Sequence, residues 1–201
     1  MTNPDYIRAL NRSDLSQWVV HFVRSTTLVS PTHLGGAAEI LDGIFSEWRI
    51  RPSLREYVTR YCPDGAACFY DAPPSVWSAI AATNPSGRPP IGVICHKNKI
   101  WELGGRPVIY TDTFDSNVWP EQERFRCVFT DLRRKPQPID WTHEREWRVR
   151  GGLNLRQPSN YTWWWPIVPN REWMTYLFAR YAELQSIYVI SENAVTNRSV
   201  T

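Results

Sequence analysis

Short strand-like segments, separated by proline and glycine, constrain the fold of this chain more than any other sequence feature. Each is a brief apolar or alternating run, which is the pattern of a β-strand. These runs lie at 17–23, 67–70, 91–95, 107–111, 125–130, 146–150 and 186–190. Many short strands with few helices predict a mixed α+β domain.

Four segments between these strands carry helical spacing or helix-start signals. Apolar residues recur at helical spacing from Ala37 to Trp48, and Gly43 within this stretch predicts that the helix ends there. The other predicted helices run over 54–61, over 76–82 and from an Asn170 cap to about residue 184. No repeat or long linker divides the sequence, so residues 1–201 are expected to form one domain.

The composition, with 42% hydrophobic and 21% charged residues, is typical of a globular protein and excludes a disordered or fibrous chain. No apolar run approaches the ~20 residues that span a bilayer, so no membrane segment is expected. The N-terminal stretch is polar and contains Asp5 and Asp14, unlike a signal peptide. A cytoplasmic location is therefore predicted.

Cysteine and histidine usage bears on redox and metal chemistry. The four cysteines show no CxxC spacing, and the four histidines show no ligand spacing. Buried thiols are therefore expected, and no metal site is predicted.

Two places in the sequence carry candidate acid–base groups. His21 lies inside an apolar strand, where a histidine is either a satisfied core residue or a functional group. Glu144 and Glu146 are two residues apart, so on a strand both side chains would face the same way. Paired carboxylates can share acid and base roles, but these residues alone favour two ordinary surface carboxylates in an ion-pair ladder with the neighbouring arginines.

Arginine greatly outnumbers lysine, and the chain contains eleven tryptophans. Guanidinium groups pair with phosphate and aromatic rings stack on bases, so this combination suits nucleic-acid binding. The segment 112–141 concentrates such residues, and it contains the candidates Trp119, Arg124, Arg126, Arg133, Arg134, Lys135 and Trp141. The alternative interpretation of this segment is that its charged residues are simply solvated and its tryptophans belong to the core. In the run Trp163–Trp165, one ring is a candidate for exposure.

Five segments resemble motifs of the DarT family of bacterial ADP-ribosyltransferase toxins, in the family's order and over nearly the whole chain. They are Val20-His21-Phe22 with the following Ile40-Leu41-Asp42-Gly43-Ile44, then ACFYDAPPS at 67–75, LGGRPVIYTD at 103–112, EWRV at 146–149 and LQSIYVIS at 184–191. The chain departs from the family after His21, where a Thr, a second His and an Asn are missing, and at Pro74, where the family has Arg. A looser likeness exists to bacterial proteins linked to abortive phage infection.

The resemblance implies a split β-sheet core with flanking helices, and NAD bound as substrate in the cleft between its halves. Glu146 would stabilise the oxocarbenium-like ribose, and Glu144 would prepare the acceptor. An arginine between the first helix and the Phe-Tyr strand would assist, and of the arginines in that interval Arg55 is preferred. The residues expected to contact NAD are His21, Phe22, Arg51, Tyr70 and Ser75.

The activity implied is ADP-ribosylation of a nucleic-acid base, with single-stranded DNA as the expected acceptor, by a toxin or phage-defence effector. An antitoxin protein is a further candidate partner. Two alternatives remain at this stage. One is an NAD glycohydrolase, in which water replaces the acceptor; the other is a catalytically degenerate module that binds nucleic acid or a partner protein.

Overall fold

A computed structural model describes residues 16–23, 36–77, 79, 91–113 and 115–198. Its main feature is an eight-stranded sheet in the order β12-β11-β10-β4-β1-β3-β8-β5, antiparallel throughout except between β10 and β11. The strands are β1 (Trp18–Phe22), β3 (Ala66–Tyr70), β4 (Gly92–His96), β5 (Arg106–Pro107), β8 (Glu146–Arg150), β10 (Trp164–Val168), β11 (Ser186–Val189) and β12 (Ala194–Asn197). The described part of the chain is therefore a mixed α+β structure, as predicted.

Two small sheets and several helices complete the described fold. β2 (Arg49–Ile50) pairs with β9 (Leu153–Asn154), and β6 (Ile109–Thr111) pairs in parallel with β7 (Cys127–Phe129). The α-helices are α2 (Ala37–Glu47), α3 (Glu56–Thr59), α5 (Lys97–Glu102) and α6 (Arg171–Arg180). The 3₁₀ turns are η1 (Pro74–Val76), η2 (Ser116–Val118), η3 (Glu121–Arg126), η4 (Thr142–Glu144) and η5 (Ile190–Glu192).

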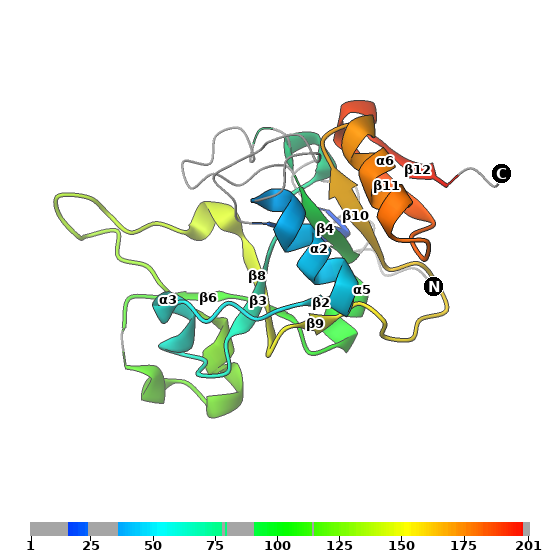
Figure 1. Ribbon diagram of the computed structural model, residues 1–201. Coiled ribbons are helices and arrows are strands. Elements are labelled where there is room, and N and C mark those ends of the chain that lie inside the picture. Colours follow the sequence, from blue (N-terminus) through cyan, green and yellow to red (C-terminus); the bar gives the residue numbers. More distant parts are fainter. Residues whose placement is uncertain (1–15, 24–35, 78, 80–90, 114, 199–201) are drawn as a thin grey trace, which may run out of the picture.

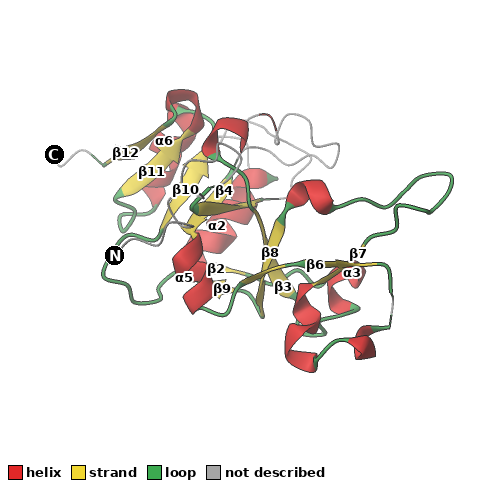
Figure 2. Cartoon of the chain, turned by 180° about the vertical axis from the view of Figure 1, so that it is seen from behind, coloured by secondary structure: helices red, strands yellow, loops and turns green. Residues whose placement is uncertain are grey.

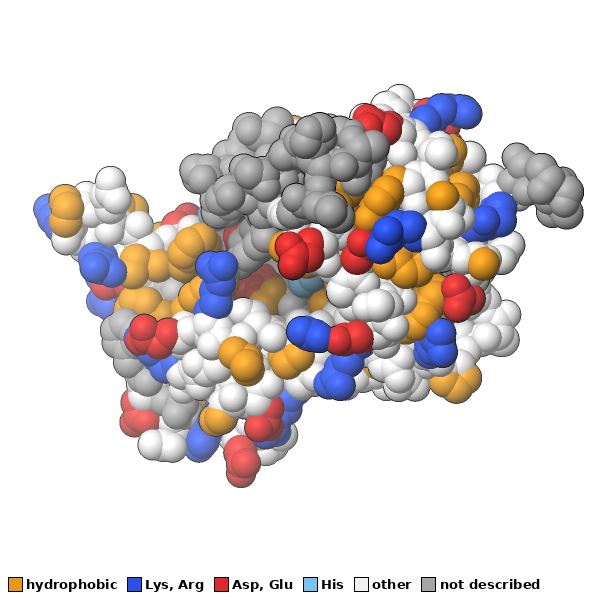
Figure 3. Space-filling view, in the orientation of Figure 1, with side chains coloured by type: hydrophobic (Ala, Val, Ile, Leu, Met, Phe, Trp, Pro, Cys, Tyr) orange, Lys and Arg blue, Asp and Glu red, His pale blue; other side chains and the backbone are white. Residues whose placement is uncertain are grey.

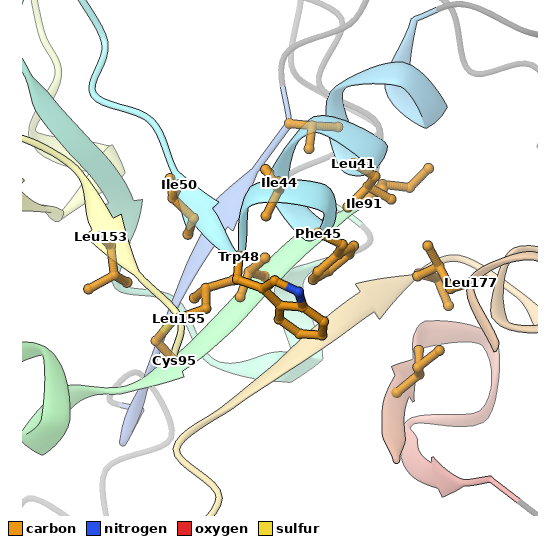
Figure 4. Packing of buried hydrophobic residues seen from close by; sticks show 14 of the residues in the cluster. Leu41, Ile44, Phe45, Trp48, Ile50, Ile91, Cys95, Leu153, Leu155 and Leu177 are labelled. Carbon is orange, nitrogen blue, oxygen red and sulfur yellow. The ribbon is translucent and has the colours of Figure 1, made fainter. Parts of the chain in front are cut away.

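Helices α2 and α6 cover one face of the large sheet (Figure 1). Leu41 and Phe45 of α2 and Leu177 of α6 belong to the same buried cluster as the alternate strand residues Val19 and Val93. The close view in Figure 4 shows this packing around Trp48. Because strand side chains alternate, the intervening residues face the other side, where Val20, Phe22 and Ile94 pack on Trp77 and Tyr188 in a smaller cluster. The sheet thus has a larger and a smaller apolar layer.

The sheet is joined most weakly between β1 and β3. These strands share a single register pair, Val20 with Tyr70, whereas β1 and β4 are paired from Trp18 to Phe22. β3 and β8 are likewise paired along their whole length. Figure 2 shows the half with β3 and β8 continuing toward β6 and β7, away from the half with β4, β10 and β11. The close β1–β4 pairing needs glycine at 92, because a Cβ there would lie 1.8 Å from the His21 carbonyl oxygen.

Several predicted boundaries are wrong, for local reasons. α2 continues through Gly43 and ends at Glu47, where its C-cap residue Trp48 takes the left-handed conformation with φ 51°. Phe125 and Arg126 belong to η3, so β7 begins only at Cys127. α6 starts at the predicted Asn170 cap, which accepts the Trp173 N–H, but ends at Arg180. At this end of the helix the Arg198 guanidinium donates hydrogen bonds to the carbonyl oxygens of Phe178 and Tyr181.

Four further predictions concern the helix over 76–82, the cysteines, the tryptophan run and membrane-spanning helices. The predicted helix over 76–82 is described only at its start, since residues 78 and 80–90 lie outside the described part. None of the four cysteines forms a disulfide; three of them are buried, and Cys68 is half-buried. Trp163 is buried and its two neighbours are half-buried, so none of the three rings is exposed. Among the described helices, none has the length and apolar character that a bilayer crossing requires.

Replacing Tyr176 with phenylalanine should make the stability of the protein less sensitive to alkaline pH. The Tyr176 and Tyr181 hydroxyls both donate to the Asp42 carboxylate at 2.8 Å, which ties α6 to α2. Burial and the hydrogen bond to Asp42 raise the pKa of Tyr176 to about 12. Since the pKa of tyrosine is about 10 in an unfolded chain, this contribution is complete below pH ~10 and is lost as the pH rises toward 12.

Urea unfolding at pH 8 and pH 11 measures this effect. We expect Tyr176→Phe to cost about 1.5 kcal/mol at pH 8 and to lose less stability than the wild type between the two pH values. An equal loss in both proteins would contradict the prediction.

Candidate functional site

Glu146 and Arg148 form a buried ion pair on β8. The Arg148 Nε donates to the Glu146 Oε1 at 2.8 Å, and the Arg148 side chain has no exposed surface. Burial alone would lower the pKa of Arg148, but the charge and hydrogen bond of Glu146 raise it above its ordinary value. The Arg148 Nη1 also donates to the carbonyls of Cys127 at 2.9 Å and Phe125 at 3.3 Å. Arg148 therefore fixes Glu146 and joins β8 to β7.

Glu144 does not continue β8, so the prediction that it faces the same way as Glu146 along one strand is wrong. Glu144 ends η4, and Arg145 takes the left-handed conformation with φ 44° before β8 begins at Glu146. The two carboxylates nevertheless stay close to the same tyrosines. The Tyr70 hydroxyl donates to the Glu144 Oε1 at 2.7 Å, and Tyr70 is the cross-strand neighbour of Glu146.

Tyr110 lies beside both carboxylates. Its hydroxyl oxygen accepts the Glu146 N–H at 3.3 Å. Burial, followed by the charges of Glu146 and Glu144, raises the pKa of Tyr110. We call Tyr70, Tyr110, Glu144, Glu146 and Arg148 the carboxylate cluster. Sequence reasoning missed Tyr110 and Arg148; the i, i+2 spacing from Glu146 was the available signal for Arg148.

His21 lies at the weak junction between β1 and β3. Its Nδ1 is 2.9 Å from the Cys68 carbonyl oxygen, and its ring is 5.7 Å from that of Phe69. Because a carbonyl only accepts, Nδ1 carries a proton. The register places Glu146 and Tyr70 on the face of Val20, with His21 facing the other way. The strand pairing therefore places His21 and Glu146 on opposite faces of the sheet and does not support the expected groove shared by the two.

A second charged cluster lies at the end of β3, on the face of Phe69. The buried Asp71 carboxylate is 2.7 Å from the Lys97 Nζ, and it accepts the Trp147 Nε1–H at 3.3 Å. The Arg145 guanidinium is 3.8 Å from the same carboxylate, while the Asp71 N–H donates to the Arg145 carbonyl. Asp71 thus connects β3, the start of α5 and the turn that precedes β8.

The space-filling view shows a hollow near the middle of one face of the molecule (Figure 3). A histidine and acidic side chains are visible within it, and basic side chains lie at its rim.

The other residues predicted to contact NAD or to assist Glu146 lie at the surface or in the core. Arg55 precedes α3 and is exposed, so the arginine that accompanies Glu146 is Arg148 rather than Arg55. Arg51 is exposed and pairs with Glu47. Ser75 lies in the single turn η1 and is exposed, while Phe22 is buried with its ring 5.9 Å from that of Tyr70. Of the residues predicted to contact NAD, Tyr70 belongs to the carboxylate cluster and Phe22 packs beside Tyr70.

The predicted nucleic-acid residues divide into two groups. Trp119, Arg124 and Arg126 are half-buried, and both arginines donate to backbone carbonyls, of Trp119 and Pro107 respectively. The other four are exposed, and they lie on or beside a projecting arm, residues 131–140, which is closed by pairing of Asp131 with Ile139 (Figure 1). These four are Arg133, Arg134, Lys135 and Trp141. The arm leads directly into η4 and Glu144.

A groove of about 430 Å³ lies away from the carboxylate cluster. It is lined by Trp48, Leu155, Tyr161, Trp163–Pro166 and Glu183–Ser186, among others, and by none of the predicted site residues. Within the described ranges, no three His, Cys, Asp or Glu side chains are grouped so that they could hold a metal ion. The groove has no titratable cluster like that beside Tyr70, so we take the carboxylate cluster as the candidate site.

A scan against protein-family models finds no match, and searches of curated proteins and of solved structures find no similar protein.

Proposed function

We propose that this chain is an ADP-ribosyltransferase that takes NAD as substrate and modifies a base of single-stranded DNA. The observation that carries the proposal is the carboxylate pair beside Tyr70, one strand away from the junction where the sheet is joined by a single register pair. A sheet divided in this way is compatible with the split core expected from the sequence resemblance. Such an activity would suit a toxin or a phage-defence effector.

The two carboxylates have different environments, which favours different roles. Glu146 is held by Arg148 and is only 7% exposed, so it is a fixed negative charge. Such a charge stabilises the positive charge that develops on the ribose carbon as the bond to nicotinamide breaks. The bonding electrons leave with nicotinamide, which becomes neutral.

Glu144 is half-buried and accepts a hydrogen bond from Tyr70, so an acceptor can approach it more easily than Glu146. In the proposed reaction a nitrogen of the base forms the new bond to the ribose carbon. Glu144 receives the proton that this nitrogen loses. His21 lies on the other face of the sheet from Glu146, so it is given no role in this step.

The arm supports the choice of a polyanionic acceptor. Arg134 and Lys135 are exposed, and the Arg133 guanidinium lies 2.9 Å from Asp112 at the base of the arm. The chain runs from these cations past the exposed Trp141 to Glu144. A strand of nucleic acid bound by its phosphates to the arm, with a base stacked on Trp141, would bring a neighbouring base to the carboxylate cluster.

Incubation of the purified protein with labelled NAD and a single-stranded oligonucleotide tests the proposal. We expect release of nicotinamide and covalent label on the oligonucleotide, with transfer that weakens as salt concentration rises. Release of nicotinamide without an adduct on DNA or RNA would instead identify an NAD glycohydrolase. Thermal stabilisation by the oligonucleotide, with neither NAD cleavage nor stabilisation by NAD, would identify a binding module.

A further inference from the structure

The residue between the two carboxylates has an unusual backbone conformation. Arg145 has φ 44° and ψ 48°, the left-handed region that residues with a Cβ rarely adopt. This conformation is unfavourable for such a residue, because its Cβ lies too close to backbone oxygen. Its N–H donates to the Thr142 carbonyl at 3.2 Å, and its carbonyl accepts the Asp71 N–H at 3.3 Å. These two hydrogen bonds therefore stabilise a backbone conformation of Arg145 that is unfavourable for an isolated residue with a Cβ.

This turn decides where the two carboxylates point. In a straight strand Glu144 and Glu146 would lie on one face as equivalent neighbours. With Arg145 left-handed, Glu144 turns to the Tyr70 hydroxyl while Glu146 enters the buried pair with Arg148. The turn thus gives one carboxylate a buried position and the other a more accessible one.

Asp71 contacts Arg145 in the turn and Trp147 just beyond it in β8. Its Oδ2 lies 3.8 Å from the Arg145 Nη2 and accepts the Trp147 Nε1–H at 3.3 Å, so it contacts the residues on either side of Glu146. The Lys97 Nζ, 2.7 Å from the Asp71 Oδ1, fixes the carboxylate from α5. Asp71 is only 8% exposed, which makes these contacts rigid rather than solvent-averaged.

We propose that Arg145 and Asp71 are positioning residues for ADP-ribosyl transfer: the left-handed turn at Arg145, held by Asp71, sets the relative placement of Glu144 and Glu146. This role rests on the proposed function, because it concerns the same two carboxylates. The competing explanation is that both residues only stabilise the fold. The experiment must distinguish this structural role from the positioning role.

The test compares Arg145→Gly with Arg145→Val. Both variants lose the guanidinium contact with Asp71, but glycine adopts the left-handed conformation freely, whereas a β-branched residue does not. We expect the glycine variant to keep kcat within about threefold of wild type, because the turn survives. The valine variant should lose about 10²-fold in kcat, the size of effect that a misplaced catalytic group produces, while its KM for NAD stays within about threefold.

Asp71→Asn provides a second measurement that does not depend on folding of the valine variant. It should lower kcat about tenfold in the wild-type background and have little effect in the Arg145→Gly background, because glycine needs no clamp to keep the turn. Effects on two residues that act through the same element are not additive. If Asp71 only stabilises the fold, Asp71→Asn should have the same effect on kcat in the wild-type and Arg145→Gly backgrounds.

The outcomes separate this role from the proposed function. Equal kcat values for folded Arg145→Gly and Arg145→Val, or equal effects of Asp71→Asn in both backgrounds, would overturn the positioning role while leaving an active transferase in place. A wild-type protein that neither cleaves NAD nor modifies the oligonucleotide would overturn the proposed function and this role with it.

Discussion

Replacing Arg148 with methionine is expected to lower the free energy of unfolding by about 3–5 kcal/mol, because it leaves the Glu146 carboxylate buried without its counter-charge. The Arg148 side chain has no exposed surface and that of Glu146 is 8% exposed, so water cannot replace the lost partner. The carbonyls of Phe125 and Cys127 lose their donor as well. Urea unfolding followed by circular dichroism measures the difference.

Arg150→Met is the matched control on the same strand and the same face. Its partner is Asp64 at 2.8 Å, but the two side chains are 48% and 63% exposed, so the loss should stay below about 1 kcal/mol. The double variant Glu146→Leu/Arg148→Met should recover much of the loss, because it removes both buried charges. If Arg148→Met costs no more than Arg150→Met, the buried pair does not have the structural role assigned to it.

The sequence predicts this pair only in part. Alternation along 146–150 correctly places Glu146, Arg148 and Arg150 on one face, with Trp147 and Val149 on the other. What alternation cannot predict is that the face is buried at Glu146 and Arg148 but open at Arg150. That difference comes from η3 and β7, which supply the Phe125 and Cys127 carbonyls.

The same limit explains the errors at the candidate site. The strand rule fails for Glu144 because Arg145 leaves the extended conformation, and the Asp71 contacts that hold it come from a distant part of the sequence. His21 was correctly placed in a strand, but its orientation depends on the register of β1 with β3. Strand existence follows from local apolar patterns, whereas register and local burial follow from long-range contacts that a single sequence does not display.

Glu146→Gln is expected to reduce the rate of ADP-ribosyl transfer by about 10²–10³-fold, since it removes the fixed negative charge proposed to stabilise the ribose cation. Glutamine keeps the size of the side chain and an oxygen that can accept from the Arg148 Nε. The KM for NAD should change by less than about threefold, because the charge acts mainly in the transition state. Steady-state release of nicotinamide, together with label incorporated into the oligonucleotide, measures both quantities.

Two further variants make the assignment specific to each carboxylate. Glu144→Gln should reduce label on the oligonucleotide by about 10²-fold, the usual contribution of a general base, and reduce the slow release of nicotinamide to water much less. Glu123→Gln, which alters a half-buried carboxylate paired with Arg126 outside the carboxylate cluster, should leave both rates near wild type. A Glu146→Gln protein that remains folded at the assay temperature and transfers at the wild-type rate would remove Glu146 from the reaction. The accessible Glu144 would then be the carboxylate to consider beside the ribose, since the Tyr70 hydroxyl already orients it.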